Sequence, residues 1–292
     1  MKIDSHVHVT PPDISADWKR YAKREPHFSL LSNAKYNLFA SAEDVLSIMK
    51  MTMTETTTET EQNNFDKAVI FGFAFQDHGL CRYVNDYVIE KISQYPDKFI
   101  GFAVTAPGKG RKGEIAAKEI ERCYKAGLKG VGELFPQGQN FSLENKKDTM
   151  AVCGICKELN IPLLLHTNET VGHYYAGKSN IELKQTETFV KNNPDLKIIL
   201  AHWGGGILFY ETMKEIKESF KNVYYDTSIS PFLYDKRIYN TVKALELCSK
   251  IIFGSDFPVL PPSRYLDDIK KSSLSENEIK MILGENAKNL LF

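Results

Sequence analysis

Short apolar runs alternate with longer stretches of helical spacing along most of the 292-residue chain. Residues 163–165 (Leu-Leu-Leu) and 198–200 (Ile-Ile-Leu) are apolar at every position, which is typical of strands buried on both faces of a parallel sheet. Eight strands are predicted: Lys2–Val7, Lys67–Phe73, Phe99–Val104, Gly130–Leu134, Pro162–Leu165, Lys197–Ala201, Val223–Asp226 and Ile251–Gly254.

The stretches between these runs are mostly long enough for a crossover helix. Amphipathic helices are predicted over Gly113–Ala126, Lys147–Leu159, Lys184–Asn192 and Glu211–Phe220. A closing helix is predicted over Ser275–Leu291, with Ser275 as its N-cap and Glu278 at the capping-box position. Eight strands that alternate with helices form either a barrel or a doubly wound sheet, and periodicity alone does not separate the two.

The segment Thr10–Asp66 departs from the alternation because it is long for a first crossover. A helix is predicted from about Ser41, followed by the Thr/Glu-rich run Thr52–Glu61. Threonine is a poor helix former, so this run is either helix or solvated loop, exposed in both cases and without chemistry. The exposed parts of the insertion leave a homodimer open.

Composition narrows the class of protein. The chain is 42% hydrophobic, enough for one sizeable core, and α/β barrels of about 250 residues form a single domain, so residues 1–292 are expected to be one domain. Lys plus Arg and Asp plus Glu are both 37, and this balance does not favour nucleic acid or an anionic membrane as partner. No run of 18 apolar residues predicts a membrane span, and the first residues do not resemble a secretory signal.

The cysteines are odd in number and scattered, which suits reduced thiols and a cytoplasmic protein. They are Cys81, Cys123, Cys153, Cys156 and Cys248. The Cys-x-x-Cys at 153–156 lies within a predicted helix and has no second pair. We interpret it as a packing feature.

Polar side chains stand at the carboxyl ends of several predicted strands. His6 and His8 lie two apart in the first strand and so face the same side. His166 follows the fifth strand, His202 the sixth and Asp256 the eighth. The active site of an α/β barrel lies at the carboxyl ends of its strands, so all five would converge at one mouth. Imidazole and carboxylate suit zinc and related divalent metals.

Four motifs together resemble those of the amidohydrolase superfamily: Ile3–His8, Leu165–Thr167, Leu200–Gly205 and Phe253–Pro258. They are most similar to the amidohydrolase-related branch, which contains aminocarboxymuconate-semialdehyde decarboxylase, the resorcylate-type decarboxylases and several hydrolases. The resemblance implies a (β/α)8 TIM barrel, here with a long insertion after the first strand. It also implies that His6, His8, His166 and Asp256 bind the metal and that His202 acts beside it.

Glu133 lies near the end of the fourth predicted strand, one residue before Leu134. Some members of the superfamily place a Lys or Glu there to bridge a second metal, which would put His166 and His202 on the second ion. Otherwise this carboxylate would hydrogen-bond a ligand or a loop, so one or two ions remain open. Zinc is the expected metal, and manganese, iron or cobalt take the same ligands.

The main functional hypothesis is a hydrolase that uses a metal-activated water on a small amide, ester or lactone. Asp256 would carry the proton of that water, and His202 would polarise the carbonyl. The alternative is a metal-dependent, non-oxidative decarboxylase of a small aromatic or unsaturated carboxylic acid. A third hypothesis is a barrel that only holds a structural ion or has lost catalysis.

Candidate substrate contacts lie in loops on the catalytic face. They are Asn168, Glu169, His173 and Lys178 after the fifth strand, and Arg264 after the eighth. Arg264 would pair with a substrate carboxylate or with a neighbouring acid. Gly204–Gly206 either lets backbone approach a substrate anion or makes a tight turn.

Overall fold

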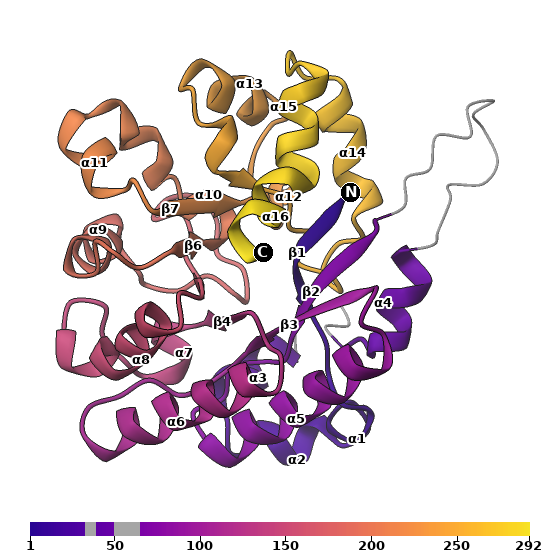
Figure 1. The fold of residues 1–292 in the computed structure, drawn as a ribbon, viewed down its shortest axis with the longest axis vertical. Coiled ribbons are helices and arrows are strands. Elements are labelled where there is room, and N and C mark those ends of the chain that lie inside the picture. The colour runs from indigo at the N-terminus through magenta and orange to yellow at the C-terminus, as the bar shows by residue number, and fades with distance from the viewer. Residues whose placement is uncertain (33–38, 50–64) are drawn as a thin grey trace.

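Eight parallel strands follow one another in sequence order around a barrel (Figure 1). The computed structural model describes residues 1–32, 39–49 and 65–292. The strands are β1 (Ile3–His8), β2 (Lys67–Phe71), β3 (Phe99–Ala103), β4 (Gly130–Leu134), β5 (Leu163–Leu165), β6 (Ile198–Leu200), β7 (Val223–Asp226) and β8 (Ile251–Ile252). All eight predicted strands are confirmed, with ends that differ by no more than two residues.

The barrel closes between β1 and the segment that follows β8. The backbone N–H of Ser5 donates to Phe253 O at 2.8 Å, and that of His8 donates to Phe257 O at 2.8 Å. The N–H of Asp256 in turn donates to His6 O at 2.9 Å. The fold is therefore the predicted barrel and not a doubly wound sheet. Its closure brings the first motif, Ile3–His8, next to the last, Phe253–Pro258.

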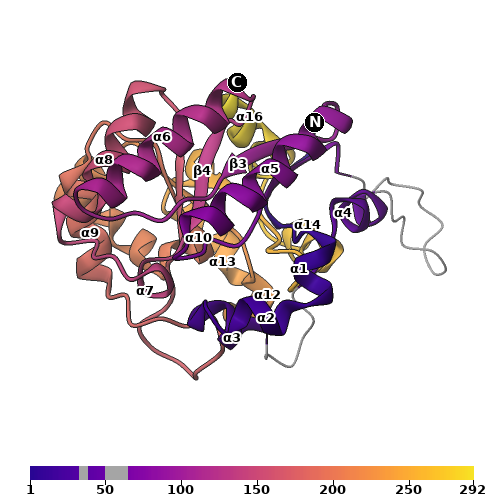
Figure 2. The same cartoon turned by 90° about the horizontal axis from the view of Figure 1, so that it is seen from below.

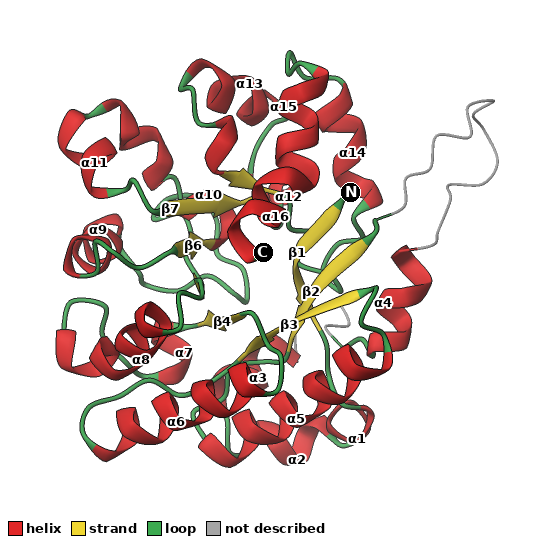
Figure 3. Ribbon diagram, viewed as in Figure 1, coloured by secondary structure: helices red, strands yellow, loops and turns green. Residues whose placement is uncertain are grey.

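Helices surround the strands (Figure 3). Those along the outside are α4 (Ala42–Met49), α5 (His78–Gln94), α6 (Arg111–Lys125), α8 (Lys146–Glu158), α9 (Leu183–Asn192), α11 (Lys214–Ser219), α13 (Arg237–Ala244), α14 (Ser263–Lys270), α15 (Glu276–Lys280) and α16 (Asn286–Leu291). One large buried cluster packs β4–β8 against several of them, and another includes Ile3, Phe71, Leu164, Ile199 and Ile252 from different strands. The core is thus split between the barrel interior and the strand–helix layer, as in other α/β barrels.

The insertion after β1 supplies three short helices at one end of the barrel. They are α1 (Pro12–Ala16), α2 (Trp18–Ala22) and α3 (Pro26–Ser32). Figure 2 shows them with α7 (Pro136–Gln139) and α12 (Ser230–Leu233), at the end opposite the two termini. The helix predicted from about Ser41 is confirmed as α4, whereas the run Thr52–Glu61 lies outside the described residues.

Two predicted helices are interrupted. Glu211–Phe220 is replaced by the 3₁₀ helix η1 (Ile207–Thr212) and by α11, because Met213 between them is extended, with φ −81° and ψ 126°. The closing helix contains a π-type turn, η3 (Met281–Glu285), between α15 and α16. That turn includes Gly284, where a Cβ would lie 2.1 Å from the carbonyl oxygen of Met1.

All five cysteines are buried and unpaired by disulfides. Cys153 and Cys156 lie on the buried side of α8. Burial raises the pKa of the Cys153 thiol to about 12, which disfavours the reactive thiolate. The packing interpretation of this pair agrees with the structure. Among the described helices, none is long and apolar enough to cross a membrane.

Candidate metal centre

His6, His8 and Asp256 form one trio of ligand atoms at the mouth of the barrel. His6 Nε2 lies 3.3 Å from His8 Nε2. Asp256 Oδ1 lies 3.5 Å from His6 Nε2 and 3.3 Å from His8 Nε2. Ligands on a tetrahedral ion with bonds of about 2.1 Å are about 3.4 Å apart. The spacing of this trio therefore fits a divalent metal.

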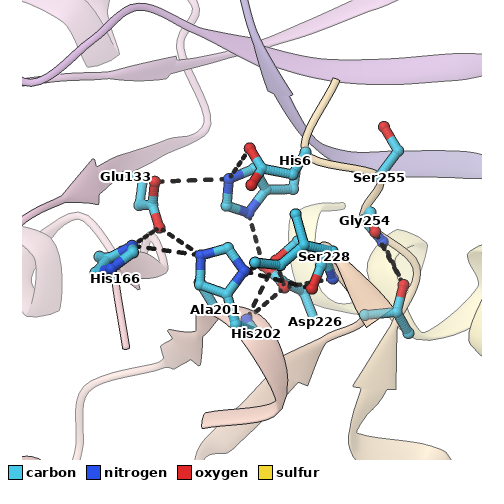
Figure 4. A network of polar contacts seen from close by, with 12 residues as sticks. His6, Glu133, His166, Ala201, His202, Asp226, Ser228, Gly254 and Ser255 are labelled. Atoms are coloured by element: carbon cyan, nitrogen blue, oxygen red, sulfur yellow. Dashed lines mark hydrogen bonds and ion pairs between the residues drawn. The ribbon is translucent and has the colours of Figure 1, made fainter. Parts of the chain in front are cut away.

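Glu133, His166 and His202 form a second trio from the ends of β4, β5 and β6 (Figure 4). Glu133 Oε1 lies 2.9 Å from His166 Nδ1 and 3.6 Å from His202 Nε2. The two imidazole nitrogens are 3.3 Å apart. These are again separations that one metal ion could span.

The Glu133 carboxylate stands between the two trios. Its second oxygen, Oε2, lies 3.4 Å from His8 Nε2 and 3.6 Å from His6 Nε2, while Oε1 faces His166 and His202. A carboxylate with one oxygen toward each group has the geometry of a bridge. The same contacts would allow it to hydrogen-bond the imidazoles around a single ion.

The buried cluster is rich in carboxylates. Burial alone would raise the pKa of Glu133, but the nearby imidazoles of His166 and His6 hold it well below its usual range. Burial likewise opposes the charge of Asp226, and His6 outweighs it so that the pKa of Asp226 is lowered. Carboxylate oxygens and imidazole nitrogens together form a donor set that a divalent cation satisfies, and metal binding would release any protons held by the imidazole nitrogens that bind it. The residues present therefore fit the expected metal.

Asp4 connects β1 to the segment that follows β8, next to the metal-ligand candidates. Its Oδ2 accepts from Ser255 Oγ at 2.6 Å, and its Oδ1 accepts from Ser255 N at 2.9 Å. Burial raises the pKa of Asp4 to about 7, although the bonds from Ser255 oppose this. The pair fixes the loop that carries Asp256 against the strand that carries His6.

A left-handed turn follows β6 and holds His202. Residues 202–206 all have positive φ, from 54° at His202 to 90° at Gly206. A Cβ at Gly205 would lie 2.3 Å from the carbonyl oxygen of Asn168. The three glycines therefore serve a tight turn packed against the β5 loop, which is the second of the two roles considered for them.

A cavity of about 620 Å³ opens over the ligand cluster. The metal-ligand candidates His8, Glu133, His166, His202 and Asp256 line its floor, and its walls include Phe73, Phe135, Tyr175 and Phe232. His27 of α3 also lines it, with its ring centroid 3.9 Å from that of Phe135. Burial and the neighbouring His166 lower the pKa of His27 to about 3, so this imidazole is neutral. The cavity suits a small, largely apolar ligand with one polar end at the metal site.

The amidohydrolase family model matches residues 3–292. The chain belongs to the amidohydrolase family. This confirms the family predicted from the four motifs.

Named relatives of this amidohydrolase include decarboxylases. The γ-resorcylate decarboxylase of Polaromonas sp. (strain JS666 / ATCC BAA-500) is 26% identical over 257 residues, which cover 72% of this chain and 75% of that protein. The structure of 5-carboxyvanillate decarboxylase from Novosphingobium aromaticivorans, with manganese and 4-hydroxy-3-methoxy-5-nitrobenzoic acid, has a TM-score of 0.74 at 14% identity, covering 100% of this chain and 96% of that one.

A similar structure carries a different reaction in its name. The 4-oxalomesaconate hydratase from Rhodopseudomonas palustris has a TM-score of 0.68 at 20% identity, covering 100% of this chain and 95% of that one. At these identities the structural likeness establishes the shared barrel fold of the amidohydrolase. The reaction has to be argued separately.

The structure distributes the candidate substrate contacts of the amidohydrolase unevenly. Only His173 lines the cavity. Asn168 Oδ1 accepts from Ser179 N at 2.9 Å, and Lys178 Nζ donates to the carbonyls of residues 172 and 173 at 3.3 Å each. These two side chains therefore brace the loop after β5.

Glu169 and Arg264 also lie away from the cavity lining. Glu169 Oε2 accepts from the hydroxyl of Tyr175 at 3.1 Å, so it orients a residue that does line the cavity. Arg264 is exposed in the first turn of α14. Its position supports neither a contact with a substrate carboxylate nor an ion pair with a neighbouring acid.

Sequence reasoning missed two kinds of site residue in the amidohydrolase. Asp226 ends β7 and its Oδ2 lies 2.8 Å from His6 Nδ1, so the strand-end rule that found the other ligands would have found it. The second is His27, which no motif singles out in the sequence and which lies in α3 and lines the cavity. No pattern in the sequence places the insertion over the mouth of the barrel.

Proposed function

We propose that this amidohydrolase is a metal-dependent, non-oxidative decarboxylase of a small aromatic or unsaturated carboxylic acid. The observation that carries the proposal is the similarity to γ-resorcylate decarboxylase, 26% identical over 257 residues. The aromatic cavity walls at Phe73, Phe135 and Phe232 support it, since they suit a planar substrate. The ligand cluster beneath them would receive the carboxylate end.

His6, His8, His166 and Asp256 would hold the metal in this proposal. A bound divalent ion supplies a fixed positive charge that anchors an anionic substrate and stabilises negative charge. Manganese accompanies the 5-carboxyvanillate decarboxylase structure, so manganese stands beside zinc as a candidate here.

The chain's own groups would complete a redox-neutral reaction. The bond between the substrate carbon and its carboxylate breaks, carbon dioxide leaves, and the electron pair remains on that carbon. One proton then replaces the carboxylate. His202 and Asp256 both line the cavity, and one of them, in its protonated form, is the donor proposed for that proton.

The test is product chemistry. The metal-loaded protein is incubated with 2,6-dihydroxybenzoate, 5-carboxyvanillate and related acids, and carbon dioxide and the ring product are measured. We expect equal amounts of the two, with one deuterium on the product carbon in D₂O. Asp256→Asn should abolish release, and His202→Asn should abolish turnover, while the exposed Lys125→Ala variant serves as the control. Water consumption with acid release and no carbon dioxide would contradict the proposal.

Hydrolysis is the second candidate, favoured by the position of Glu133 between the two trios. A bridging carboxylate would hold two ions, and paired ions are common in hydrolytic sites. We therefore expect the number of metal ions per chain, measured by mass spectrometry, to distinguish the decarboxylase from the hydrolase. One ion in both the wild type and Glu133→Gln supports the decarboxylase. Two ions that fall to one in Glu133→Gln support the hydrolase, whereas full metal without turnover on either substrate class supports a structural ion.

A further inference from the structure

Asp226, at the end of β7, contacts two histidines of the site from behind (Figure 4). Its Oδ2 accepts from His6 Nδ1 at 2.8 Å. Its Oδ1 accepts from the backbone N–H of His202 at 3.0 Å and from the hydroxyl of Ser228. Asp226 and Ser228 are both 0% exposed, so these bonds form away from water, where they are strong.

The donors and acceptors of this network can be assigned one by one. An ionised carboxylate only accepts, and a serine hydroxyl has a single proton to donate. The Ser228 proton therefore goes to Asp226, and Ser228 Oγ accepts from His202 Nδ1 at 2.7 Å. The Ser228 carbonyl, another pure acceptor, lies 3.3 Å from the same nitrogen. Both acceptors require a proton on His202 Nδ1.

The assigned ring protons determine what each histidine presents to the cavity. With Nδ1 of His202 engaged by Ser228, its Nε2 faces His166 Nδ1 at 3.3 Å. With Nδ1 of His6 engaged by Asp226, its Nε2 faces His8 Nε2 at 3.3 Å. One carboxylate thus reaches one histidine in each trio.

We propose that Asp226 and Ser228 are positioning residues that fix the ring protons of His6 and His202, so that both imidazoles present Nε2 to the site. Asp226 acts on His6 directly and on His202 through the Ser228 hydroxyl. Neither residue lines the cavity, so both act through the histidines. The kinetic consequence rests on the proposed function, in which His202 is a proton donor, whereas the ring-proton assignment holds for any reaction.

The first test is ¹⁵N-histidine NMR of the zinc-loaded, diamagnetic protein. In the wild type we expect slowly exchanging, downfield Nδ1–H resonances for His6 and His202. In Ser228→Ala the His202 resonance should move upfield and exchange faster, because only the more distant carbonyl remains as acceptor, while that of His6 stays. In Asp226→Asn both resonances should change.

The control is Ser230→Ala, which removes the same atom two residues along the loop. Ser230 Oγ donates to Thr227 O at 2.6 Å and accepts from Trp203 Nε1 at 2.6 Å, so it serves packing. We expect both histidine resonances to be retained in this variant. A wild-type His202 protonated only at Nε2, or an unchanged His202 resonance in Ser228→Ala, would overturn the proposal.

Kinetics with a turned-over substrate provide the second readout. Loss of a group that orients a catalytic histidine costs about 10–100-fold in activity. Ser228→Ala should therefore lower kcat by about that factor, with KM within about twofold of wild type and metals per chain unchanged. A raised KM at normal kcat would instead indicate a substrate contact and contradict the positioning role. Failure to release carbon dioxide would remove the proposed function alone, since the NMR assignment requires no substrate.

Discussion

At the scale of single residues, the backbone around the site adopts conformations that are rare for L-residues. His202, Trp203 and Asp256 have φ values of 54°, 58° and 59°. Each such residue costs on the order of 1–3 kcal/mol and persists only where its surroundings hold it. Trp203 is 0% exposed, and Asp256 donates its N–H to His6 O at 2.9 Å. Packing and closure of the barrel therefore hold two functional candidates in strained positions.

Gly205→Ala tests that packing. Its φ of 60° disfavours any Cβ, and the added atom would lie 2.3 Å from the carbonyl oxygen of Asn168. We expect a loss of about 2–4 kcal/mol in the free energy of unfolding, from the left-handed backbone and the overlap, measured by urea denaturation.

Gly154→Ala is the matched control. Gly154 lies within α8, and a Cβ there would meet nothing within 4 Å. Alanine should stabilise this helix by about 0.5–1 kcal/mol. Equal effects of the two substitutions would show that the turn after β6 does not require its glycines.

At the scale of elements, the cap signal in the sequence predicted where a helix begins but not where it is interrupted. Ser275 and Glu278 form the expected capping box at α15, whereas no cap signal warned that Met213 would separate η1 from α11. The amphipathic helix predicted over Lys147–Leu159 is α8, but the apolar side chain of Met150 within it is 67% exposed. Hydrophobic periodicity predicts a helix but does not fix which of its faces is buried, because that face depends on the neighbouring elements.

The capping box of α15 predicts a pH-dependent contribution to stability. Bonds from the Ser275 backbone and hydroxyl and from Lys243 lower the pKa of Glu278 from its ordinary 4.5 to about 2. Because the folded-state pKa is depressed, this contribution is present above pH 4.5 and is lost as the pH falls toward 2. Glu278→Gln should therefore show a smaller drop in Tm than wild type between pH 5 and pH 3.

Ser275→Ala provides the comparison at neutral pH. It removes the oxygen that accepts from Glu278 N at 3.3 Å, and loss of such an N-cap costs about 1 kcal/mol. Urea denaturation at pH 7 measures that loss. If Glu278→Gln and wild type lose Tm in parallel on acidification, the carboxylate does not stabilise the start of α15.

At the scale of the whole molecule, the barrel and most of its ligand cluster could be predicted because parallel strands end at a common edge. His166, His202 and Asp256 follow that rule. The cavity wall could not be predicted, since His27 and Phe232 reach it from two short helices, α3 and α12, whose positions depend on packing. The sequence also could not predict that Arg264 lies on the surface. The metal-ligand candidates on the cavity floor can be predicted from strand-end residues, whereas the residues of the cavity wall depend on tertiary structure.

The closure between β1 and the segment after β8 also imposes an order of assembly. Asp4 and Ser255, bonded beneath the ligands, are 251 residues apart in sequence. Contacts of such separation are opposed by the loop-closure entropy of the intervening chain, which slows their formation. A growing chain would expose the His6–His8 pair long before Asp256 is synthesised. The trio of His6, His8 and Asp256 is therefore complete only once the segment after β8 has packed against β1. Tight metal binding would then indicate that the barrel has closed.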